Sequence, residues 1–335
     1  MKTILITGAG GYIGSVATSL VLENGYNVVA IDNFSTGYEA PLKLLQSKYG
    51  SSRIKIYNVD LQGFFSHIFV ENKIDAVLHY AASCSVNESM QRPEKYFTNN
   101  SVATQRLFHT MLDAGVDKIV FSSTCAVYGE AQYVPIDELH PTNPANPYGE
   151  SKLISETYLS WYSKLNKLRH VALRYFNVCG ATDDGEIGDS KNPSVHLMQN
   201  AVRGALNIEP FYLTCGKFDT PDKTPIRDYV NVVDLNDAHI KALEYLFKGG
   251  KSEIINLGTG TGNSVMEIVK AVEEITSKKI KVDEGEARAG EYATMIANIK
   301  KAKDVLSWEP KHTLKQSVET LVKWYTKHPF GWYKN

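Results

Sequence analysis

Short apolar runs alternate with longer stretches of helical periodicity through the first half of the chain. The first run begins at Thr3 and leads directly into Gly8, after which Val16, Leu20 and Val21 follow helical spacing. Alternation of this kind predicts an α/β fold with a parallel, doubly wound sheet of the Rossmann type. The further predicted strands are 27–31, 54–59, 76–79, 119–122 and 171–176.

The alternation stops after Val178. Residues 180–193 and 216–225 are polar stretches typical of loops, and we expect them in a smaller lobe at the carboxyl edge of the sheet, where ligands bind in such folds. A helical pattern over 232–247 and an apolar run at 254–257 then return to the first domain. We therefore predict a cofactor domain at 1–178, with a return segment at 231–259, and a discontinuous substrate lobe formed by 179–230 and 260–335.

The first strand ends in a glycine-rich turn that carries Gly8, Gly11 and Gly14. Glycines between a strand and a helix let the backbone approach a pyrophosphate at the helix N-terminus. The next strand ends at Asp32, the position of an acid that hydrogen-bonds an adenosine ribose. A carboxylate there repels a 2′-phosphate, so this order of elements favours NAD over NADP.

Tyr148 and Lys152 stand four residues apart, just after Asn146 and Pro147. We predict a helix with Asn146 as its N-cap and Pro147 as its first residue, which places both side chains on one face. An ammonium near a phenol lowers the phenol pKa from its ordinary value of about 10, as a general base requires. An ordinary surface pair has the same spacing, and the glycine-rich turn favours the catalytic interpretation.

Charge, apolar runs and cysteine spacing exclude several classes of protein. The 335 residues include 36 Lys and Arg against 37 Asp and Glu, a net charge of -1, so no basic excess indicates nucleic acid or an anionic membrane as a partner. The strand at Thr3 leaves no room for a signal peptide, and no apolar run approaches the ~20 residues of a membrane span, so we expect a cytoplasmic protein. Scattered cysteines indicate neither zinc nor a disulfide framework; they are Cys84, Cys125, Cys179 and Cys215.

Together these segments resemble the extended short-chain dehydrogenase/reductase family, and within it the UDP-glucose 4-epimerases. The resemblance covers nearly the whole chain, with matching order and spacing. The segments that carry it are 7–14, 32–33, 60–61, 79–83, 99–100, 122–129, 148–152, 173–177, 227–229 and 288–291.

The resemblance implies a catalytic set of Thr124, Tyr148 and Lys152, in which Lys152 also contacts the nicotinamide ribose. Related dehydratases carry an Asp-Glu pair after the threonine, whereas this chain has Cys125 and Ala126, which cannot serve an elimination. The implied reaction is therefore C4 epimerisation of a UDP-hexose, in galactose and carbohydrate metabolism. Sugar C4 is oxidised to a ketone, the sugar rotates, and hydride returns to the opposite face.

Further contacts are implied position by position. Cys84 stands where some epimerases have a lysine near the cofactor, which leaves the tightness of NAD retention open. The expected substrate contacts are Thr124, Tyr148, Asn177, His196, Leu197, Arg227, Arg288 and Met295. The expected NAD contacts are Gly8, Gly11, Tyr12, Ile13, Gly14, Asp32, Asn33, Asp60, Leu61, Tyr80, Ala81, Ala82, Asn99, Tyr148, Lys152 and Tyr175.

Several alternatives stay open from the sequence. Another UDP-sugar, such as a pentose, a uronate or an N-acetylhexosamine, differs only in pocket residues. A net dehydrogenase or reductase and a noncatalytic NAD-dependent sensor share the same fold. The resemblance also implies a homodimer through the helices that follow Tyr96 and Tyr148, with Leu107, Leu153 and Trp161 among their apolar residues. His79 ends a predicted strand and is interpreted as a core histidine. For Arg227 and Arg288, the alternative to substrate binding is a surface salt bridge to Asp228 or Glu291.

Overall fold

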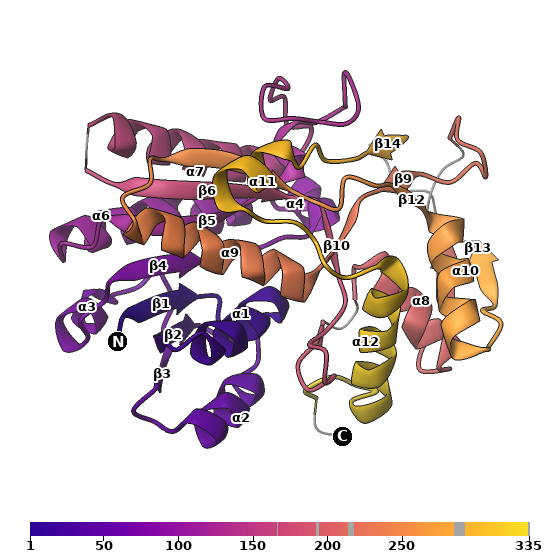
Figure 1. Cartoon of the computed structure of the whole chain (residues 1–335), viewed down its shortest axis with the longest axis horizontal. Coiled ribbons are helices and arrows are strands. Elements are labelled where there is room, and N and C mark those ends of the chain that lie inside the picture. Colours follow the sequence, from indigo (N-terminus) through magenta and orange to yellow (C-terminus); the bar gives the residue numbers. More distant parts are fainter. Residues whose placement is uncertain (166, 192–193, 214–217, 285–291, 334–335) are drawn as a thin grey trace. The chain divides into compact units, whose positions relative to one another are not determined.

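Seven strands form the principal sheet of the computed structural model, which describes residues 1–165, 167–191, 194–213, 218–284 and 292–333. The order across the sheet is β11-β6-β5-β4-β1-β2-β3, and the pairs β1–β2, β1–β4, β2–β3 and β4–β5 are parallel (Figure 1). The strands are β1 (Thr3–Thr7), β2 (Asn27–Asp32), β3 (Ile54–Asn58), β4 (Ala76–His79), β5 (Lys118–Thr124), β6 (Arg169–Tyr175) and β11 (Glu253–Leu257).

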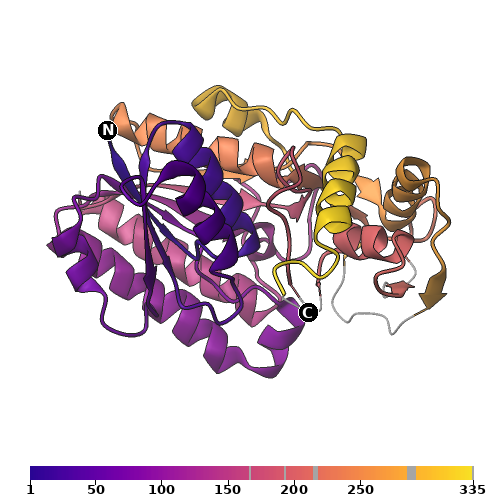
Figure 2. The same cartoon turned by 90° about the horizontal axis from the view of Figure 1, so that it is seen from below.

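Helices cover both faces of this sheet, which confirms the doubly wound α/β fold. Helices α6 and α7 lie on one face, and α1 and α9 lie on the other (Figures 1 and 2). The helical segments are α1 (Tyr12–Glu23), α2 (Ala40–Tyr49), α3 (Ser66–Glu71), α4 (Val86–Gln91), α5 (Pro93–Tyr96), the π-helix η1 (Phe97–Val102), α6 (Ala103–Asp113), the 3-10 helix η2 (Cys125–Val127), α7 (Pro147–Lys164) and α9 (Val232–Phe247).

An apolar stripe on α6 explains how that helix packs. Ala103, Leu107 and Met111 repeat every four residues and are buried together with Phe108. They pack against strand residues such as Phe121 in the core between α6 and the sheet. The helical period of the sequence therefore sets which face of α6 meets the sheet.

The chain divides into two units. The first contains residues 1–129, 141–174 and 236–255, and the second contains 130–140, 175–235 and 256–335. Each unit interleaves with the other along the sequence, so each is discontinuous. That the first holds the cofactor and the second the substrate stays a prediction.

The second unit combines short strands with four helices among its described residues. Helices α8, α10 and α12 enclose a core that includes Met198, Ile268, Leu321 and Trp324. Its elements are β7 (Asn177–Cys179) paired with β10 (Tyr229–Asn231), a three-stranded sheet of β12 (Asn263–Ser264), β9 (Ile226–Arg227) and β14 (Thr294–Met295), β8 (Phe211–Leu213) paired with β13 (Val282–Glu284), and helices α8 (Leu197–Ala205), α10 (Val265–Thr276), α11 (Lys300–Leu306) and α12 (Leu314–Lys327).

Most predicted strands agree with the structure to within two residues. The segment 76–79 matches β4, and the helical pattern at 232–247 matches α9. Strand β5 runs further than predicted, so Thr124 is its last residue rather than a residue of the following loop. Within the described ranges, no helix is both long enough and apolar enough to cross a lipid bilayer.

Candidate active site

The glycine-rich turn between β1 and α1 depends on close backbone contacts. A Cβ on Gly14 would lie 2.1 Å from the carbonyl oxygen of Gly8, and one on Gly8 would lie 2.6 Å from the nitrogen of Ala81. Gly8 also has a φ of 69°, a left-handed conformation that favours glycine. Gly11 is the N-cap of α1, and the first turn of that helix carries no acidic residue. The helix N-terminus therefore suits an anionic group such as a pyrophosphate.

Asp32 joins the end of β2 to this turn. Its Oδ2 accepts a hydrogen bond from the Gly10 N–H at 2.8 Å, and its Oδ1 accepts one from the Phe34 N–H at 2.7 Å. Burial raises the pKa of Asp32, while these backbone hydrogen bonds act against that increase. Asn33 donates from Nδ2 to Asp60 Oδ2 at 2.9 Å, which links the ends of β2 and β3. Three predicted cofactor residues, Asp32, Asn33 and Asp60, therefore occupy the carboxyl edge of the sheet.

The carboxyl end of β4 is fixed by a buried histidine. His79 Nδ1 hydrogen-bonds Thr7 Oγ1 at 2.6 Å, and its Nε2 hydrogen-bonds Thr104 Oγ1 at 2.7 Å. Burial and, to a smaller extent, the nearby Lys152 charge lower the pKa of His79 to about 3. The interpretation of His79 as a core histidine with satisfied hydrogen bonds is confirmed.

Sequence reasoning missed an asparagine that connects two predicted cofactor segments. Asn236 donates from Nδ2 to the Ile13 carbonyl at 3.3 Å and accepts at Oδ1 from the Tyr80 hydroxyl at 2.8 Å. It therefore joins the start of α1 to the segment after β4. Asn236 lies on α9, far along the chain from both partners, and no local motif identifies it.

Helix α7 begins as the sequence predicts. Asn146 Oδ1 accepts a hydrogen bond from the Gly149 N–H at 2.9 Å, and Pro147 is the first helical residue. A Cβ on Gly149 would lie 2.5 Å from the Ala126 carbonyl oxygen, so glycine lets the first turn of α7 approach the segment after β5. That approach brings the α7 turn carrying Tyr148 to the segment that directly follows Thr124.

Lys152 lies one turn further along α7 and is 3% exposed. Its Nζ donates to the Ser122 carbonyl at 2.8 Å and lies 4.9 Å from the centroid of the Phe121 ring. Burial lowers the pKa of Lys152 to about 8, while Cys84 and Glu156 act in the opposite direction. An ammonium with this pKa is still mostly protonated at neutral pH, so it can favour a nearby phenolate.

A buried ion pair follows on the same face of α7, and sequence reasoning missed it. Glu156 accepts from Arg174 at both carboxylate oxygens, with an Nε–Oε1 distance of 2.9 Å, and also accepts from the Ser123 hydroxyl. The Arg174 guanidinium lies 4.8 Å from the Tyr128 ring centroid, and its hydrogen bonds to Glu156 hold the pKa of Arg174 above its ordinary value against the effect of burial. The sequence did carry a signal for Glu156. Tyr148, Lys152 and Glu156 follow one another at intervals of four residues, which places them on one face of a helix.

In the second unit, neighbouring strands hold three of the predicted substrate residues. Met295 of β14 is the register partner of Arg227 in β9, and the Asn177 N–H donates to the Asp228 carbonyl at 2.9 Å. His196 is the N-cap of α8, and Leu197 is its first residue. The structure thus brings Asn177, Arg227 and Met295 together.

Asp228 organises that strand cluster. Its carboxylate is fully buried and accepts hydrogen bonds from the Thr259 N–H at 2.6 Å and the Thr259 hydroxyl at 2.7 Å. It also accepts from the N–H groups of Gly260 at 3.0 Å and Ala297 at 3.2 Å. The Arg227 guanidinium donates from Nη1 to the Ile226 carbonyl at 2.9 Å. Arg288, predicted as a second phosphate-binding arginine, lies outside the described residues.

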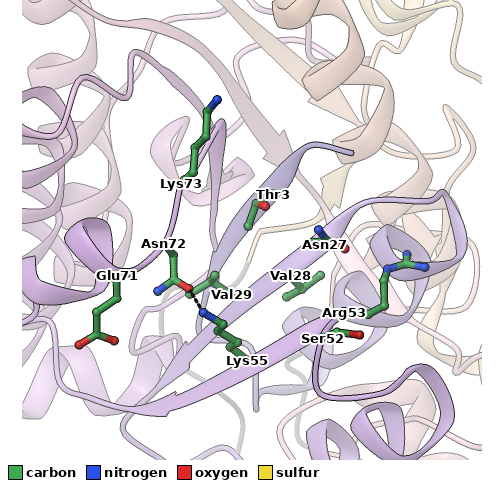
Figure 3. A pocket seen from close by; sticks show the side chains of 10 residues that line it. All are labelled: Thr3, Asn27, Val28, Val29, Ser52, Arg53, Lys55, Glu71, Asn72 and Lys73. Carbon is green, nitrogen blue, oxygen red and sulfur yellow. Dashed lines mark hydrogen bonds between the residues drawn. The ribbon is translucent and has the colours of Figure 1, made fainter.

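A cavity of about 220 Å³ lies at the opposite, amino-terminal edge of the sheet (Figure 3). Its lining side chains bond to one another and to nearby backbone. Lys55 Nζ donates to Asn72 Oδ1 at 2.8 Å, and Arg53 donates to the carbonyls of Leu22 and Tyr26. None of the predicted site residues lines this cavity, so it is separate from the candidate active site.

Comparison with known proteins gives a consistent set of relatives. The family model described as GDP-mannose 4,6 dehydratase matches residues 5–321. UDP-glucose 4-epimerase of Lacticaseibacillus casei is 41% identical over 333 residues, which cover 98% of each chain.

Two solved structures share the fold over nearly their whole length. UDP-glucose 4-epimerase from Bifidobacterium longum, in complex with NAD⁺ and UDP, has a TM-score of 0.93 and 32% identity, covering 99% of this chain and 100% of that one. The UDP-Glc/GlcNAc 4-epimerase of Campylobacter jejuni has a TM-score of 0.83 and 36% identity, covering 98% of this chain and 100% of that one.

The ion pair between Glu156 and Arg174 leads to a stability prediction. Arg174→Met should lower the free energy of unfolding by about 3–5 kcal/mol, because it leaves a buried carboxylate without its partner. Combining Arg174→Met with Glu156→Leu should recover most of that loss. Urea unfolding of the single and double variants measures both effects.

The exposed ion pair between Lys300 and Asp304 supplies a control. These side chains are 77% and 54% exposed, so Lys300→Met should change stability by less than about 1 kcal/mol. An Arg174→Met protein as stable as wild type would contradict the assigned role of the buried pair.

Proposed function

The chain belongs to the UDP-glucose 4-epimerases of the extended short-chain dehydrogenase/reductase family, and we propose that it interconverts UDP-glucose and UDP-galactose with NAD as its cofactor. The observation that carries this proposal is the buried Lys152 ammonium, held against the Ser122 carbonyl one helical turn from Tyr148. A protonated lysine buried at the carboxyl edge of a nucleotide-binding sheet suits a site that needs a phenolate base.

The residues of the first unit fit a bound dinucleotide. The N-terminus of α1 suits the pyrophosphate, and Asp32 stands at the end of β2, where an adenosine ribose is recognised. NAD, when bound, supplies reversible hydride transfer at sugar C4. The chain's own groups handle the proton, the orientation of the sugar and the anchoring of the nucleotide.

Tyr148 acts as the base that takes the O4 proton and later returns it. Lys152 lowers the pKa of the Tyr148 phenol through its positive charge. Thr124, which ends β5, orients the sugar oxygen or the phenolate through its hydroxyl; its Oγ1 accepts from the Ala126 N–H at 3.2 Å. The product of the first half-reaction is a 4-ketohexose that stays bound and turns before it is reduced on the other face.

The second unit anchors the UDP portion in this proposal. Arg227 binds the diphosphate, since a guanidinium offers several donors in a planar arrangement. Asn177, His196 and Leu197 contact the substrate beside it. The Asp228 carboxylate, next to Arg227 in the chain, accepts hydrogen bonds from Thr259, Gly260 and Ala297. These contacts support the role of Arg227, because they fix the segment that carries the arginine.

A broader sugar specificity is the second candidate. The Campylobacter jejuni relative is described as acting on both UDP-Glc and UDP-GlcNAc. Met295, 5% exposed on β14, has a flexible side chain that adapts to irregular space. We therefore propose that N-acetylated substrates are accepted more weakly than UDP-glucose and UDP-galactose.

The central test combines product analysis with one substitution. Purified protein incubated with UDP-galactose should form UDP-glucose without added NAD⁺ being consumed, because the reaction is redox-neutral. Tyr148→Phe keeps the ring but deletes the proton acceptor, so kcat should fall by about 10²-fold or more while substrate binding persists. NADH formed in proportion to product would indicate a net dehydrogenase, and a fully active Tyr148→Phe protein would exclude the proposed base.

Met295→Tyr tests the specificity proposal. A bulky tyrosine should narrow the sugar pocket, so kcat/KM for the N-acetylated pair should fall more than kcat/KM for UDP-glucose and UDP-galactose. The size of the effect should be modest, about 10-fold, as expected for steric discrimination. Unchanged selectivity would remove Met295 from the sugar pocket.

We further propose a homodimer formed through α6 and α7. Trp161 on α7 is 59% exposed, whereas Leu107 on α6 is fully buried in the core of its own unit and Leu153 is half-buried. Light scattering at micromolar concentration should give twice the subunit mass, and Trp161→Glu should reduce it to one subunit. Val70→Glu, at an exposed position on α3, should leave the dimer intact. A wild-type protein with the mass of one subunit would reject the dimer.

A further inference from the structure

Tyr96 is the last residue of α5 and leads directly into the π-helix η1. Its side chain is fully buried. The ring meets the ring of Tyr148 edge to face, with centroids 6.3 Å apart and planes at 82°. This geometry is a favourable arrangement for two aromatic rings. A buried side chain therefore lies directly against the proposed base.

Hydrogen bonds fix the Tyr96 ring from its other end. The Tyr96 hydroxyl accepts from the Ser85 N–H at 3.0 Å and donates to Glu88 Oε2 at 2.9 Å. The other Glu88 oxygen accepts from Lys95 Nζ at 2.6 Å. Burial and the neighbouring Glu88 carboxylate raise the pKa of Tyr96, so its hydroxyl stays protonated and keeps donating. The ring thus has one defined orientation.

The contact with Tyr96 acts on the part of Tyr148 that the helix does not fix, which is its ring. Helix α7 fixes the backbone of Tyr148, but a tyrosine ring still turns about two side-chain bonds. Tyr148 is half-buried near the start of the helix, whereas Lys152 is sealed in the interior. Proton transfer requires the phenol oxygen within hydrogen-bond reach of the sugar hydroxyl. A rigid neighbouring ring restricts the orientations that Tyr148 can adopt.

We propose that Tyr96 is a positioning residue that holds the Tyr148 ring in its reactive orientation. This inference rests on the proposed function, in which Tyr148 is the base. Glu88 and the Ser85 N–H belong to the same arrangement, because they fix Tyr96. Small displacements of a catalytic group reduce the rate strongly, by up to about 10²-fold for 1 Å.

The chain offers a matched control on the same helix. Tyr162 of α7 and Phe108 of α6 also meet edge to face, with centroids 6.1 Å apart and planes at 88°. Tyr162→Leu therefore removes an equivalent aromatic contact at the far end of α7, away from Tyr148. The comparison separates loss of packing from loss of positioning.

The experiment compares Tyr96→Leu, Tyr96→Phe and Tyr162→Leu in the holoenzyme, with kcat expressed per bound dinucleotide. Tyr96→Leu should lower kcat by about 10-fold to 100-fold and leave KM for UDP-galactose within twofold. Tyr96→Phe keeps the edge contact but loses the two hydroxyl hydrogen bonds, so its kcat should lie between those of wild type and Tyr96→Leu. Tyr162→Leu should lower the melting temperature and leave kcat unchanged.

Equal losses of kcat in Tyr96→Leu and Tyr162→Leu, or an unchanged kcat in Tyr96→Leu, would overturn the positioning role. If Tyr96→Leu does not fold, Tyr96→Met, which fills more of the same space, replaces it with the same expected separation of kcat from KM. Wild-type and Tyr148→Phe proteins are assayed alongside. A wild type without epimerase activity, or an active Tyr148→Phe, refutes the proposed function itself and is thereby distinguished from failure at Tyr96.

Discussion

The arrangement of the first unit depends on keeping the Lys152 ammonium charged while it is buried. Burial disfavours the charge and, with Cys84 and Glu156 acting in the opposite direction, lowers the Lys152 pKa to about 8. The Ser122 carbonyl and the Phe121 ring stabilise the ammonium directly. Glu156 adds a negative charge, but both of its carboxylate oxygens accept hydrogen bonds from Arg174. Lys152, Glu156 and Arg174 together carry a net charge of one positive unit. This charge can favour a phenolate at Tyr148.

Close backbone approach is the second constraint, and glycine meets it at two places. Gly14 lets α1 pack against the Gly8 carbonyl, and Gly149 lets α7 pack against the Ala126 carbonyl. The first contact forms the turn suited to a pyrophosphate, and the second brings the start of α7 to the segment after β5. Larger side chains at these glycines would move the turn between β1 and α1 or the helix that carries Tyr148. The positions of α1 and α7 therefore depend on backbone contacts as well as on side-chain packing.

Local patterns predicted much of this structure, and the misses share one cause. The strand positions, the Asn146 cap and the core role of His79 follow from neighbouring residues in the sequence. Glu156, Asn236 and Tyr96 have roles that depend on partners brought together by the fold. Asn236 contacts Ile13 and Tyr80, which lie 223 and 156 residues away in the chain, and no spacing rule reveals such contacts. Tyr96 looks like an ordinary core aromatic until its contact with Tyr148 is known.

The residues proposed for proton chemistry belong to one unit, and those proposed for anchoring the UDP portion and for sugar specificity belong to the other. Thr124, Tyr148 and Lys152 lie in the first, and Arg227 and Met295 lie in the second. Met295 is paired with Arg227 on short strands that the buried Asp228 carboxylate holds in place. Within the first unit, the burial of Lys152 and its ion-pair network are formed by residues other than Met295. The proposed base and the proposed specificity residue therefore require separate substitutions in the tests.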